Sequence, residues 1–441
     1  MTTETLTMNE TCGCPEGRGL SRRTLMRRLA AGGALGATLT VLEGFSPAAR
    51  FAFAAEPASY AGDVLVVLSL RGGFDGLNAI VPAGDPAYAT ARPTIGVPTS
   101  RLIGADGIFG LHPGLAPLEP FWKAGTFGAV HAVGQPNPTR SHFQAMEELE
   151  RAAPGSSLRT GWLDRTVGTR ADAGAFQAVQ AGSSAIPASL RGPNPEMALD
   201  SVKSFAISGA WDDGERARWT TALRAMAVPG APAPIADPAR AALAAAGTTA
   251  ALAAKTYQPS GEASYPDTHL GKALRDVAQL IKAGIGLQVA TVDEGDWDMH
   301  AGMGQAAKGG WMYDHLHDLA AALAAFATDL KSDSKRDFFS RVTLVTLSEF
   351  GRRVGENGSG GVDHGHGNAV LLLGGGVNGG KVHGRWPGLA DEDLVDGDLA
   401  GATDYRLVLG EILTARCGAS SLGDVFPGLT GDALGVVRPR S

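Results

Sequence analysis

The feature that most constrains the fold is a series of short apolar runs, each bounded by Gly, Pro or Asp. Most of these runs are continuously apolar rather than alternating, which is typical of strands buried on both faces of a sheet. We expect strands at residues 64–70, 127–133, 175–181, 204–208, 287–293, 342–348 and 369–373.

Helical periodicity fills several gaps between these runs. In residues 269–285, one stripe carries Leu270, Leu274, Val277 and Ile281, as expected for a helix packed on a core. Residues 311–330 and 403–416 form two more predicted helices. Strands that alternate with helices of this length predict an α/β fold: a doubly wound, mostly parallel sheet with helices on both faces.

The first 54 residues have the pattern of a signal peptide. Arg22 and Arg23 form a twin-arginine pair, an apolar stretch covers residues 29–42, and residues 52–54 read Ala-Phe-Ala, which suits a signal peptidase. The alternative is an N-terminal amphipathic helix. We favour export by the twin-arginine route, which predicts a periplasmic or extracellular protein.

The mature chain, residues 55–441, is expected to be a single domain. Residues 225–264 are rich in Ala and Pro with little strand signal, which predicts a helical or flexible insertion. Removal of the signal leaves Cys417 as the only cysteine, so no intramolecular disulfide can form.

Charge and hydropathy exclude two classes of partner. The net charge of −7 argues against nucleic acid, which requires a basic surface. After residue 60, no uninterrupted apolar run reaches the length of about 18 residues that a spanning helix needs. We therefore expect no transmembrane helix in the mature chain.

Reactive side chains follow four of the predicted strands and precede a fifth. In a parallel sheet, loops at the carboxyl ends of strands converge on a ligand crevice. The sequence therefore predicts one polar site at that edge of the sheet. Its candidate members are Arg71, Asp75, Thr139, Arg140, Ser141, Asp296, Asp298, His300, Glu349, Asp363, His364 and His366.

This set of residues is suited to a divalent metal. Clustered carboxylates repel one another unless a cation neutralises them, and mixed oxygen and nitrogen donors suit zinc or manganese. Each motif also has a structural interpretation. Asp75 can cap a turn, Ser141 with Gln144 fits a helix capping box, and Asp296 to His300 can be a solvated turn. His364 and His366, two histidines within three loop residues, suit a metal better than packing.

These motifs resemble the bacterial family catalogued as domain of unknown function (DUF) 1501, from about residue 63 to residue 429. That family is placed with the alkaline phosphatase and sulfatase-like superfamily, which implies a one- or two-metal site. The matching segments are RGGFDGLNAIVP, LHPGLAPL, PTRSHFQAM, DWDMHAG, TLSEFGRR, ENGSGGVDHGHGN and GGKVHGRWPGL.

The resemblance implies roles for individual residues. Asp75 is similar to the superfamily's first metal-binding Asp, and Ser141 is similar in place to its nucleophile, with Thr139 as the rival. Pro138-Thr139-Arg140 looks like the Pro-Ser-Arg of sulfatases, but their modified nucleophile would then fall at Pro136, which disfavours a formylglycine sulfatase.

The metal-binding motifs match with one important departure. Asp296 and His300 have the spacing of a phosphatase metal site, whereas the family's Gly-Trp-Asp-Thr-His points to Asp298. His364 or His366 resembles the last metal-binding His. Ser348 to Gly351 looks like Ser-Asp-His-Gly, with Glu349 for Asp and Phe350 for His.

Phenylalanine cannot bind a metal, so the Phe350 replacement removes one nitrogen donor unless His142, Asp363 or another group compensates.

The sequence thus leads to two hypotheses. The first is an exported metal-dependent hydrolase of phosphate or sulfate esters, acting on a small or polymer-borne anionic substrate. It would use zinc, manganese, magnesium or calcium, with Ser141 or Thr139 attacking and Arg71 or Arg140 holding the anion. The second is a catalytically inert binding or cell-envelope protein that reuses the fold.

Overall fold

The computed structural model describes residues 63–168, 176–205, 212–332 and 336–440 of the 441-residue chain. The predicted signal peptide, residues 1–54, lies outside the described residues. Within the described residues, none of the helices combines the length and apolarity needed to cross a bilayer.

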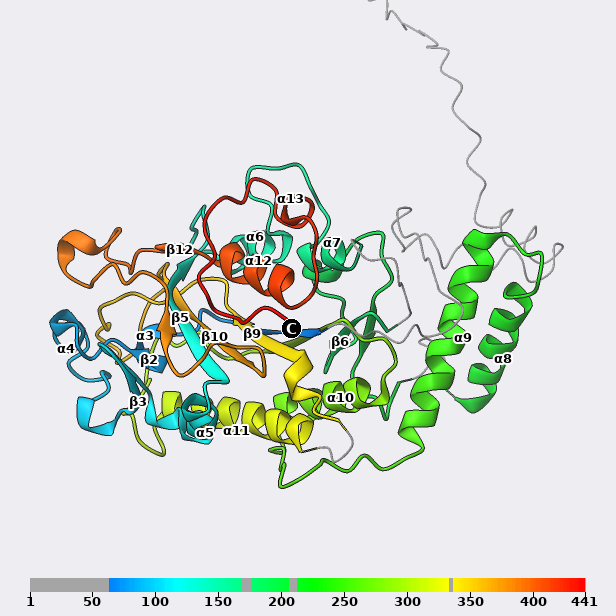
Figure 1. The fold of residues 1–441 in the computed structure, drawn as a ribbon, viewed down its shortest axis with the longest axis horizontal. Coiled ribbons are helices and arrows are strands. Elements are labelled where there is room, and N and C mark those ends of the chain that lie inside the picture. The colour runs from blue at the N-terminus through cyan, green and yellow to red at the C-terminus, as the bar shows by residue number, and fades with distance from the viewer. Residues whose placement is uncertain (1–62, 169–175, 206–211, 333–335, 441) are drawn as a thin grey trace, which may run out of the picture. The chain divides into compact units, whose positions relative to one another are not determined.

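A large, mostly parallel sheet lies at the centre of the described fold (Figure 1). Its strand order is β11-β5-β10-β9-β1-β8-β6-β7, and β12 also pairs with β5. Every pairing in this sheet is parallel except those of β10, which runs antiparallel to both β5 and β9. The strands are β1 (Val64–Leu70), β5 (Phe127–Gly134), β6 (Ala178–Ala181), β7 (Met197–Leu199), β8 (Val289–Glu294), β9 (Val342–Leu347), β10 (Asn368–Gly374), β11 (Val382–His383) and β12 (Thr403–Asp404).

Most of the predicted strands are confirmed to within two residues at each end, and two differ more. Residues 175–181 give a shorter strand, β6, and residue 175 lies outside the described part. A strand at residues 204–208 is wrong where the structure describes it, because Ser204 and Phe205 belong to no strand. The strand that pairs with β6 is β7, which lies earlier in the chain. After β7, the backbone N–H of Val202 donates to Asp276 Oδ2 at 2.9 Å. This bond ties the chain to a helix rather than to the sheet.

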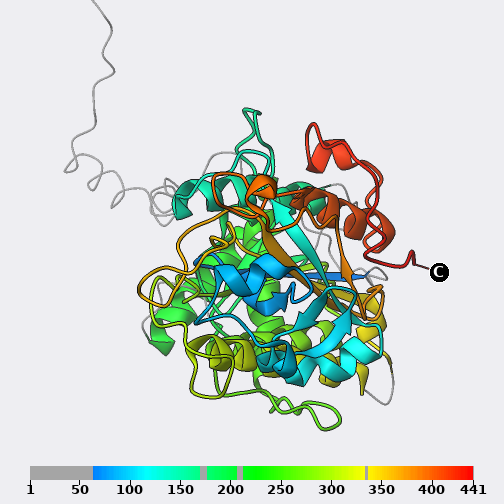
Figure 2. The same ribbon diagram turned by 90° about the vertical axis from the view of Figure 1, so that its left-hand side faces the viewer.

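Helices cover both faces of the sheet because the strands are apolar on both sides. Along β1, Val66 and Leu68 face one core with Leu274, whereas Leu65 and Val67 face a second core with Ile412. Figures 1 and 2 show the two helical layers on opposite sides of the sheet. One layer contains α10 (His269–Ala283) and α11 (Trp311–Lys331), and the other contains α6 (His142–Arg151), α7 (Trp162–Gly168) and α12 (Tyr405–Ala415).

Local sequence sets the ends of these helices, as α10 illustrates. The Thr268 side chain accepts a hydrogen bond from the backbone N–H of Gly271 and caps the first turn. Gly284 ends the helix with φ of 65°, a left-handed conformation that glycine adopts without steric cost. The predicted helices at residues 269–285, 311–330 and 403–416 are all confirmed, with ends shifted by no more than two residues.

Several smaller elements complete the described fold. The Ala- and Pro-rich residues 225–264 are helical over much of their length, since they include the last residues of α8 (Asp213–Met226) and all of α9 (Ala233–Ala253). A small antiparallel sheet, which the sequence did not predict, contains β2 (Ile80–Val81), β4 (Phe109–Leu111) and β3 (Ile103–Asp106). The short helices are α3 (Gly76–Ala79), α4 (Pro86–Ala91), α5 (Glu119–Lys123) and α13 (Leu422–Val425).

The direction of β10 decides which loops meet. The loops after β1, β5, β8 and β9 leave the sheet at one edge because these strands run parallel. The loop before β10 would reach the opposite edge if β10 were also parallel. Since β10 is antiparallel to its neighbours, its first residue lies at the same edge as the four strand ends.

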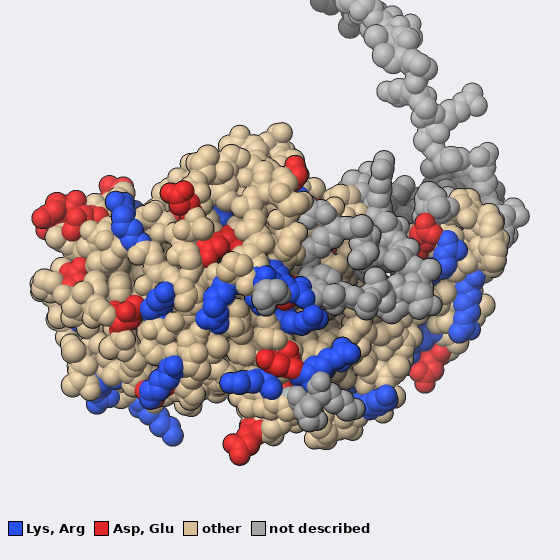
Figure 3. All heavy atoms as spheres, viewed as in Figure 1, with Lys and Arg blue, Asp and Glu red and all other residues tan. Residues whose placement is uncertain are grey.

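On the molecular face drawn in Figure 3, acidic and basic side chains are scattered among each other.

Candidate functional site

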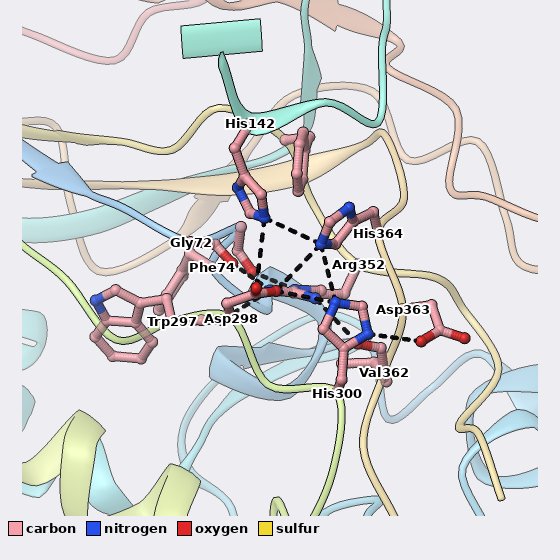
Figure 4. Close-up of polar contacts among 12 residues, drawn as sticks. Gly72, Phe74, His142, Trp297, Asp298, His300, Arg352, Val362, Asp363 and His364 are labelled. Carbon is pink, nitrogen blue, oxygen red and sulfur yellow. Dashed lines mark hydrogen bonds and ion pairs between the residues drawn. The ribbon is translucent and has the colours of Figure 1, made fainter. Parts of the chain in front are cut away.

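Three histidine side chains surround the carboxylate of Asp298 at this edge of the sheet (Figure 4). His142 is the first residue of α6, Asp298 and His300 follow β8, and His364 precedes β10. The Nε2 atom of His364 lies 3.0 Å from Nε2 of His142, 3.0 Å from Nε2 of His300 and 3.1 Å from Asp298 Oδ1. Asp298 Oδ1 is also 3.1 Å from Nε2 of His300, and its Oδ2 is 3.5 Å from Nε2 of His142. We call these four residues the His/Asp cluster.

The second ring nitrogen of each histidine is bound to an acceptor. His142 Nδ1 lies 2.7 Å from Glu349 Oε1, and His300 Nδ1 lies 2.7 Å from Asp363 Oδ1. His364 Nδ1 lies 2.9 Å from the backbone carbonyl oxygen of Arg140. A carboxylate or carbonyl can only accept, so each Nδ1 must donate a proton to it. In the neutral rings, the three Nε2 lone pairs then point into the cluster.

Buried hydrogen bonds hold Glu349 in place. Its Oε1 atom accepts from the backbone N–H of Gly72 at 2.8 Å, and its Oε2 atom accepts from the hydroxyl of Ser348 at 3.1 Å. The Gln135 amide donates to the backbone carbonyl of Glu349 at 2.8 Å. Glu349 is therefore not in the cluster itself but positions His142 from behind.

Arg352 connects the loops that carry the cluster. Its guanidinium is fully buried and donates to Asp298 Oδ1 at 2.8 Å, to the carbonyls of Gly73 at 2.6 Å and Val362 at 3.1 Å, and also to that of Gly72. Partial burial would raise the pKa of Asp298, but the hydrogen bond from Arg352 and its positive charge outweigh this effect and lower that pKa to about 2. Asp298 is thus a carboxylate at every physiological pH.

The Phe350 ring packs against the cluster and contributes no donor. Its centroid lies 4.8 Å from the ring of His142 and 4.8 Å from the ring of His364. The sequence analysis proposed that His142 could compensate for the missing nitrogen at Phe350. The position of His142 agrees with that proposal, because its Nε2 atom faces the cluster.

Three members of the cluster have donor atoms that could hold one divalent cation. Ligand atoms of His142, Asp298 and His364 all lie within 4.8 Å of one another, and His300 Nε2 adjoins two of them. Two nitrogens bound to one tetrahedral ion at about 2.1 Å lie about 3.4 Å apart, close to the 3.0 Å between His364 Nε2 and the Nε2 atom of each of the other two rings. Metal-binding histidines typically donate their other nitrogen to a carboxylate or carbonyl, as all three do here.

Asp75 lies outside the cluster, which corrects the expectation that it binds metal with the others. Its side chain is 1% exposed and its Oδ2 atom lies 2.6 Å from the fully buried guanidinium of Arg92. Arg92 also donates to the side chain of Asn78 at 2.8 Å and to two backbone carbonyls. The buried charge of Asp75 is therefore neutralised by a guanidinium, a partner that its sequence context did not reveal.

Three further expected ligands also point elsewhere. Asp296 has φ of 66° and its carboxylate lies 3.3 Å from Nε2 of His315, so the family-like choice of Asp298 over Asp296 agrees with the geometry. His366 Nε2 lies 3.1 Å from the carbonyl of Gln135, and burial lowers the pKa of this histidine. Asp363 contacts His300 rather than the centre of the cluster, and this hydrogen bond lowers the pKa of the Asp363 carboxyl.

The expected nucleophiles lie next to the cluster in the chain. Ser141 occupies the N-cap position of α6, as the capping-box pattern indicates, but its side chain makes no capping hydrogen bond. The Thr139 hydroxyl donates to Gln144 Oε1 at 3.1 Å and accepts from the backbone N–H of Ser141 at 3.3 Å. The Thr139 hydroxyl is thus held by two local hydrogen bonds, whereas the Ser141 hydroxyl makes no capping bond.

Both arginines expected to hold an anion are paired with carboxylates. Arg71 lies 2.9 Å from Glu150 and 2.9 Å from Asp293. The Arg140 guanidinium donates to Asp398 Oδ2 at 3.1 and 2.5 Å. Arg140 contributes to the cluster through its backbone carbonyl instead. The sequence analysis did not name Arg352 as a site residue. It is the first of two consecutive arginines after β9, and nothing in the local sequence distinguishes the buried Arg352 from the more exposed Arg353.

Comparison with known proteins gives a family but no characterised relative. The model of the family described as protein of unknown function (DUF1501) matches residues 126–400, and no curated protein matches the chain. The match includes all four residues of the His/Asp cluster together with Glu349 and Arg352, whereas Asp75 and Arg92 precede it. The chain therefore belongs to the DUF1501 family of proteins of unknown function.

Proposed function

We propose that this protein is an exported, metal-dependent hydrolase of phosphate or sulfate esters, built on a doubly wound core like that of alkaline phosphatase. The observation that carries the proposal is the His/Asp cluster, in which three imidazole Nε2 atoms and one carboxylate converge while every Nδ1 atom is held by an acceptor. The twin-arginine pattern at Arg22 and Arg23 supports export.

The residues would divide into ligands and positioning groups. His142, Asp298, His300 and His364 would hold the ion, and Glu349, Asp363 and the Arg140 carbonyl would orient the rings. A nitrogen-rich set favours zinc over manganese, magnesium or calcium, which prefer oxygen. Bound there, the ion would supply a Lewis acid that polarises the ester and stabilises negative charge on the attacking oxygen.

A single ion is the stoichiometry that the contacts support. Asp75, the counterpart of a metal-binding Asp in the superfamily, is already neutralised by Arg92 at 2.6 Å. Phe350 stands where the superfamily pattern has a histidine, and its ring packs on the cluster without a donor atom. A second ion would therefore lack two of its ligands.

Ser141 is the hydroxyl that we propose attacks the ester. Its Oγ forms a bond to phosphorus or sulfur as the bond to the leaving alcohol breaks, and its proton ends on that alcohol. Water then cleaves the ester of Ser141, giving its hydroxyl to phosphate or sulfate and returning the other proton to Oγ. The cluster is accessible to such a substrate, since the side chains of Asp298 and His300 are 48% and 45% exposed.

The experiment is turnover of nitrophenyl phosphate and sulfate esters by the purified mature protein. We expect metal-dependent activity that a chelator removes, that Ser141→Ala reduces at least about 100-fold, and that Thr139→Ala largely retains. Folded protein that contains metal yet turns over no ester would instead support the second candidate, a binding protein without catalysis. The observation that favours this candidate is that Ser141 makes no side-chain hydrogen bond to a base in the described part of the chain.

A further inference from the structure

Each of the arginines beside the His/Asp cluster contacts a carboxylate. Arg140, whose carbonyl holds His364, pairs with Asp398 at 2.5 Å. Arg353, which follows Arg352, lies 3.6 Å from the other oxygen of Asp398, a residue that is 4% exposed at its side chain. A single buried carboxylate thus faces two guanidiniums on segments that form the site, and these three groups together have a formal charge of +1.

The cluster itself carries no surplus positive charge. One guanidinium (Arg352) accompanies three carboxylates (Asp298, Glu349 and Asp363), so with neutral imidazoles the formal charge is −2. One divalent cation brings this sum to zero. Just after β1, Arg71 lies 2.9 Å from both Glu150 and Asp293, and the −1 charge of these three groups offsets the +1 charge of Arg140, Arg353 and Asp398.

We propose that the site selects monoanionic esters, such as phosphodiesters or sulfate monoesters, over dianionic phosphate monoesters. This inference rests on the proposed function and names its substrate class. A monoanion leaves a neutral metal-loaded site with one negative charge, whereas a dianion leaves it with two and finds no unpaired guanidinium to offset the second. The half-exposed side chains of Asp298, His300 and Asp363 also leave room for the second substituent of a diester.

The test compares three substrates on metal-loaded wild-type protein near pH 8, where a phosphate monoester is a dianion because its second pKa is about 6. The substrates are bis(nitrophenyl) phosphate, nitrophenyl sulfate and nitrophenyl phosphate. We expect kcat/KM for one or both monoanions to exceed that for the dianion at least about tenfold, and the first two substrates separate a phosphodiesterase from a sulfatase. Faster hydrolysis of the dianion would overturn the inference and leave the proposed hydrolase intact.

A binding measurement decides the charge preference without turnover. Calorimetry with phenylphosphonate, a dianion, and its monomethyl ester, a monoanion, should give tighter binding of the monoanion by at least about tenfold. Tighter binding of the dianion would overturn the inference. Absence of turnover in all three assays, with the monoanion still bound more tightly, would reject the hydrolase and keep the charge selectivity.

Variants of the Asp398 loop test the cause of the selectivity. Asp398→Asn should release the charge of Arg140 and Arg353 and shift the binding ratio several-fold toward the dianion, whereas Asp396→Asn is the matched control. Asp396 has φ of 54°, which Asn tolerates, and its backbone carbonyl rather than its side chain meets Arg353 at 2.8 Å. If Asp398→Asn fails to fold, Arg353→Gln decides, because loss of an arginine that faces Asp398 and not the substrate should change monoanion affinity less than about twofold. A loss above tenfold would make Arg353 a substrate ligand and overturn the inference.

Discussion

The Nε2 atoms of His142 and His364 face each other at 3.0 Å although the residues lie 222 positions apart in the chain. The Nδ1 atoms of both rings are turned to acceptors, Glu349 Oε1 for His142 and the Arg140 carbonyl for His364. Two neutral imidazoles in these tautomers would bring lone pairs together, which a shared cation converts from repulsion to attraction. The geometry of this pair is the basis of the predictions that follow.

The two aspartates of the Asp296–Asp298 motif should separate in function. Asp298→Asn removes the carboxylate charge from the centre of the cluster and is expected to lower metal affinity at least about tenfold. Asp296→Asn is the matched control, since Asp296 faces His315 at 3.3 Å and Asn tolerates its positive φ. Titration with a fluorescent zinc indicator measures both affinities. Equal losses in the two variants would show that the cluster is not the binding site.

Asp363 should act on the metal through His300. Asp363→Ala leaves His300 Nδ1 without its acceptor at 2.7 Å and is expected to weaken metal binding by about 10- to 100-fold. Asp391→Ala, an exposed substitution in the short 3-10 helix Asp391–Asp393, is the control. Unchanged affinity in Asp363→Ala would argue that the His300 ring is held in place by other contacts.

Asp75→Asn should change stability and not metal content. The variant leaves the fully buried Arg92 charge without its carboxylate partner, and breaking a buried ion pair costs about 3–5 kcal/mol. Denaturant unfolding measures the free energy of unfolding, and elemental analysis measures the metal. Loss of metal with unchanged stability would restore Asp75 as a ligand and contradict the assignment to Arg92.

The low pKa of Asp298 predicts a pH dependence in metal-free protein. Its pKa is about 2 in the folded state against an ordinary value of 3.8, so its ionised form stabilises the fold above about pH 4. That contribution is lost as the pH falls through about 2. The difference in unfolding free energy between wild type and Asp298→Asn, measured with a chelator present, should therefore shrink between about pH 4 and pH 2. A difference that is constant with pH would exclude this ionisation as the cause.

Much of the fold could be predicted because continuous apolar runs report buried strands directly. The run at residues 64–70 coincides with β1, and the stripe of Leu270 and Leu274 lies in the core below the sheet. The strand expected at 204–208 was wrong for Ser204 and Phe205, the two residues of it that the structure describes, whereas the three residues of β7 are too few to give a strand signal. The reversed direction of β10 left no sequence signal, since strand direction depends on tertiary contacts.

The sequence predicted where the candidate site lies, but it predicted less well which residues face it. Asp298, His300 and His364 meet because their strands end, or begin, at one edge of the sheet. The sequence analysis also placed Asp75 and His366 at that edge. In the structure, however, Asp75 contacts Arg92 and His366 contacts the carbonyl of Gln135. Which of two neighbouring side chains points into a site depends on loop conformation, and residue spacing alone does not specify it.

The most direct test of the account is the metal content of the mature protein compared with that of two matched histidine variants. We predict close to one divalent ion per chain by elemental analysis in wild type and in His366→Gln, and little or none in His364→Gln, because only His364 contacts His142, His300 and Asp298. Folded wild-type protein without metal, or equal metal in the two variants, would contradict the account.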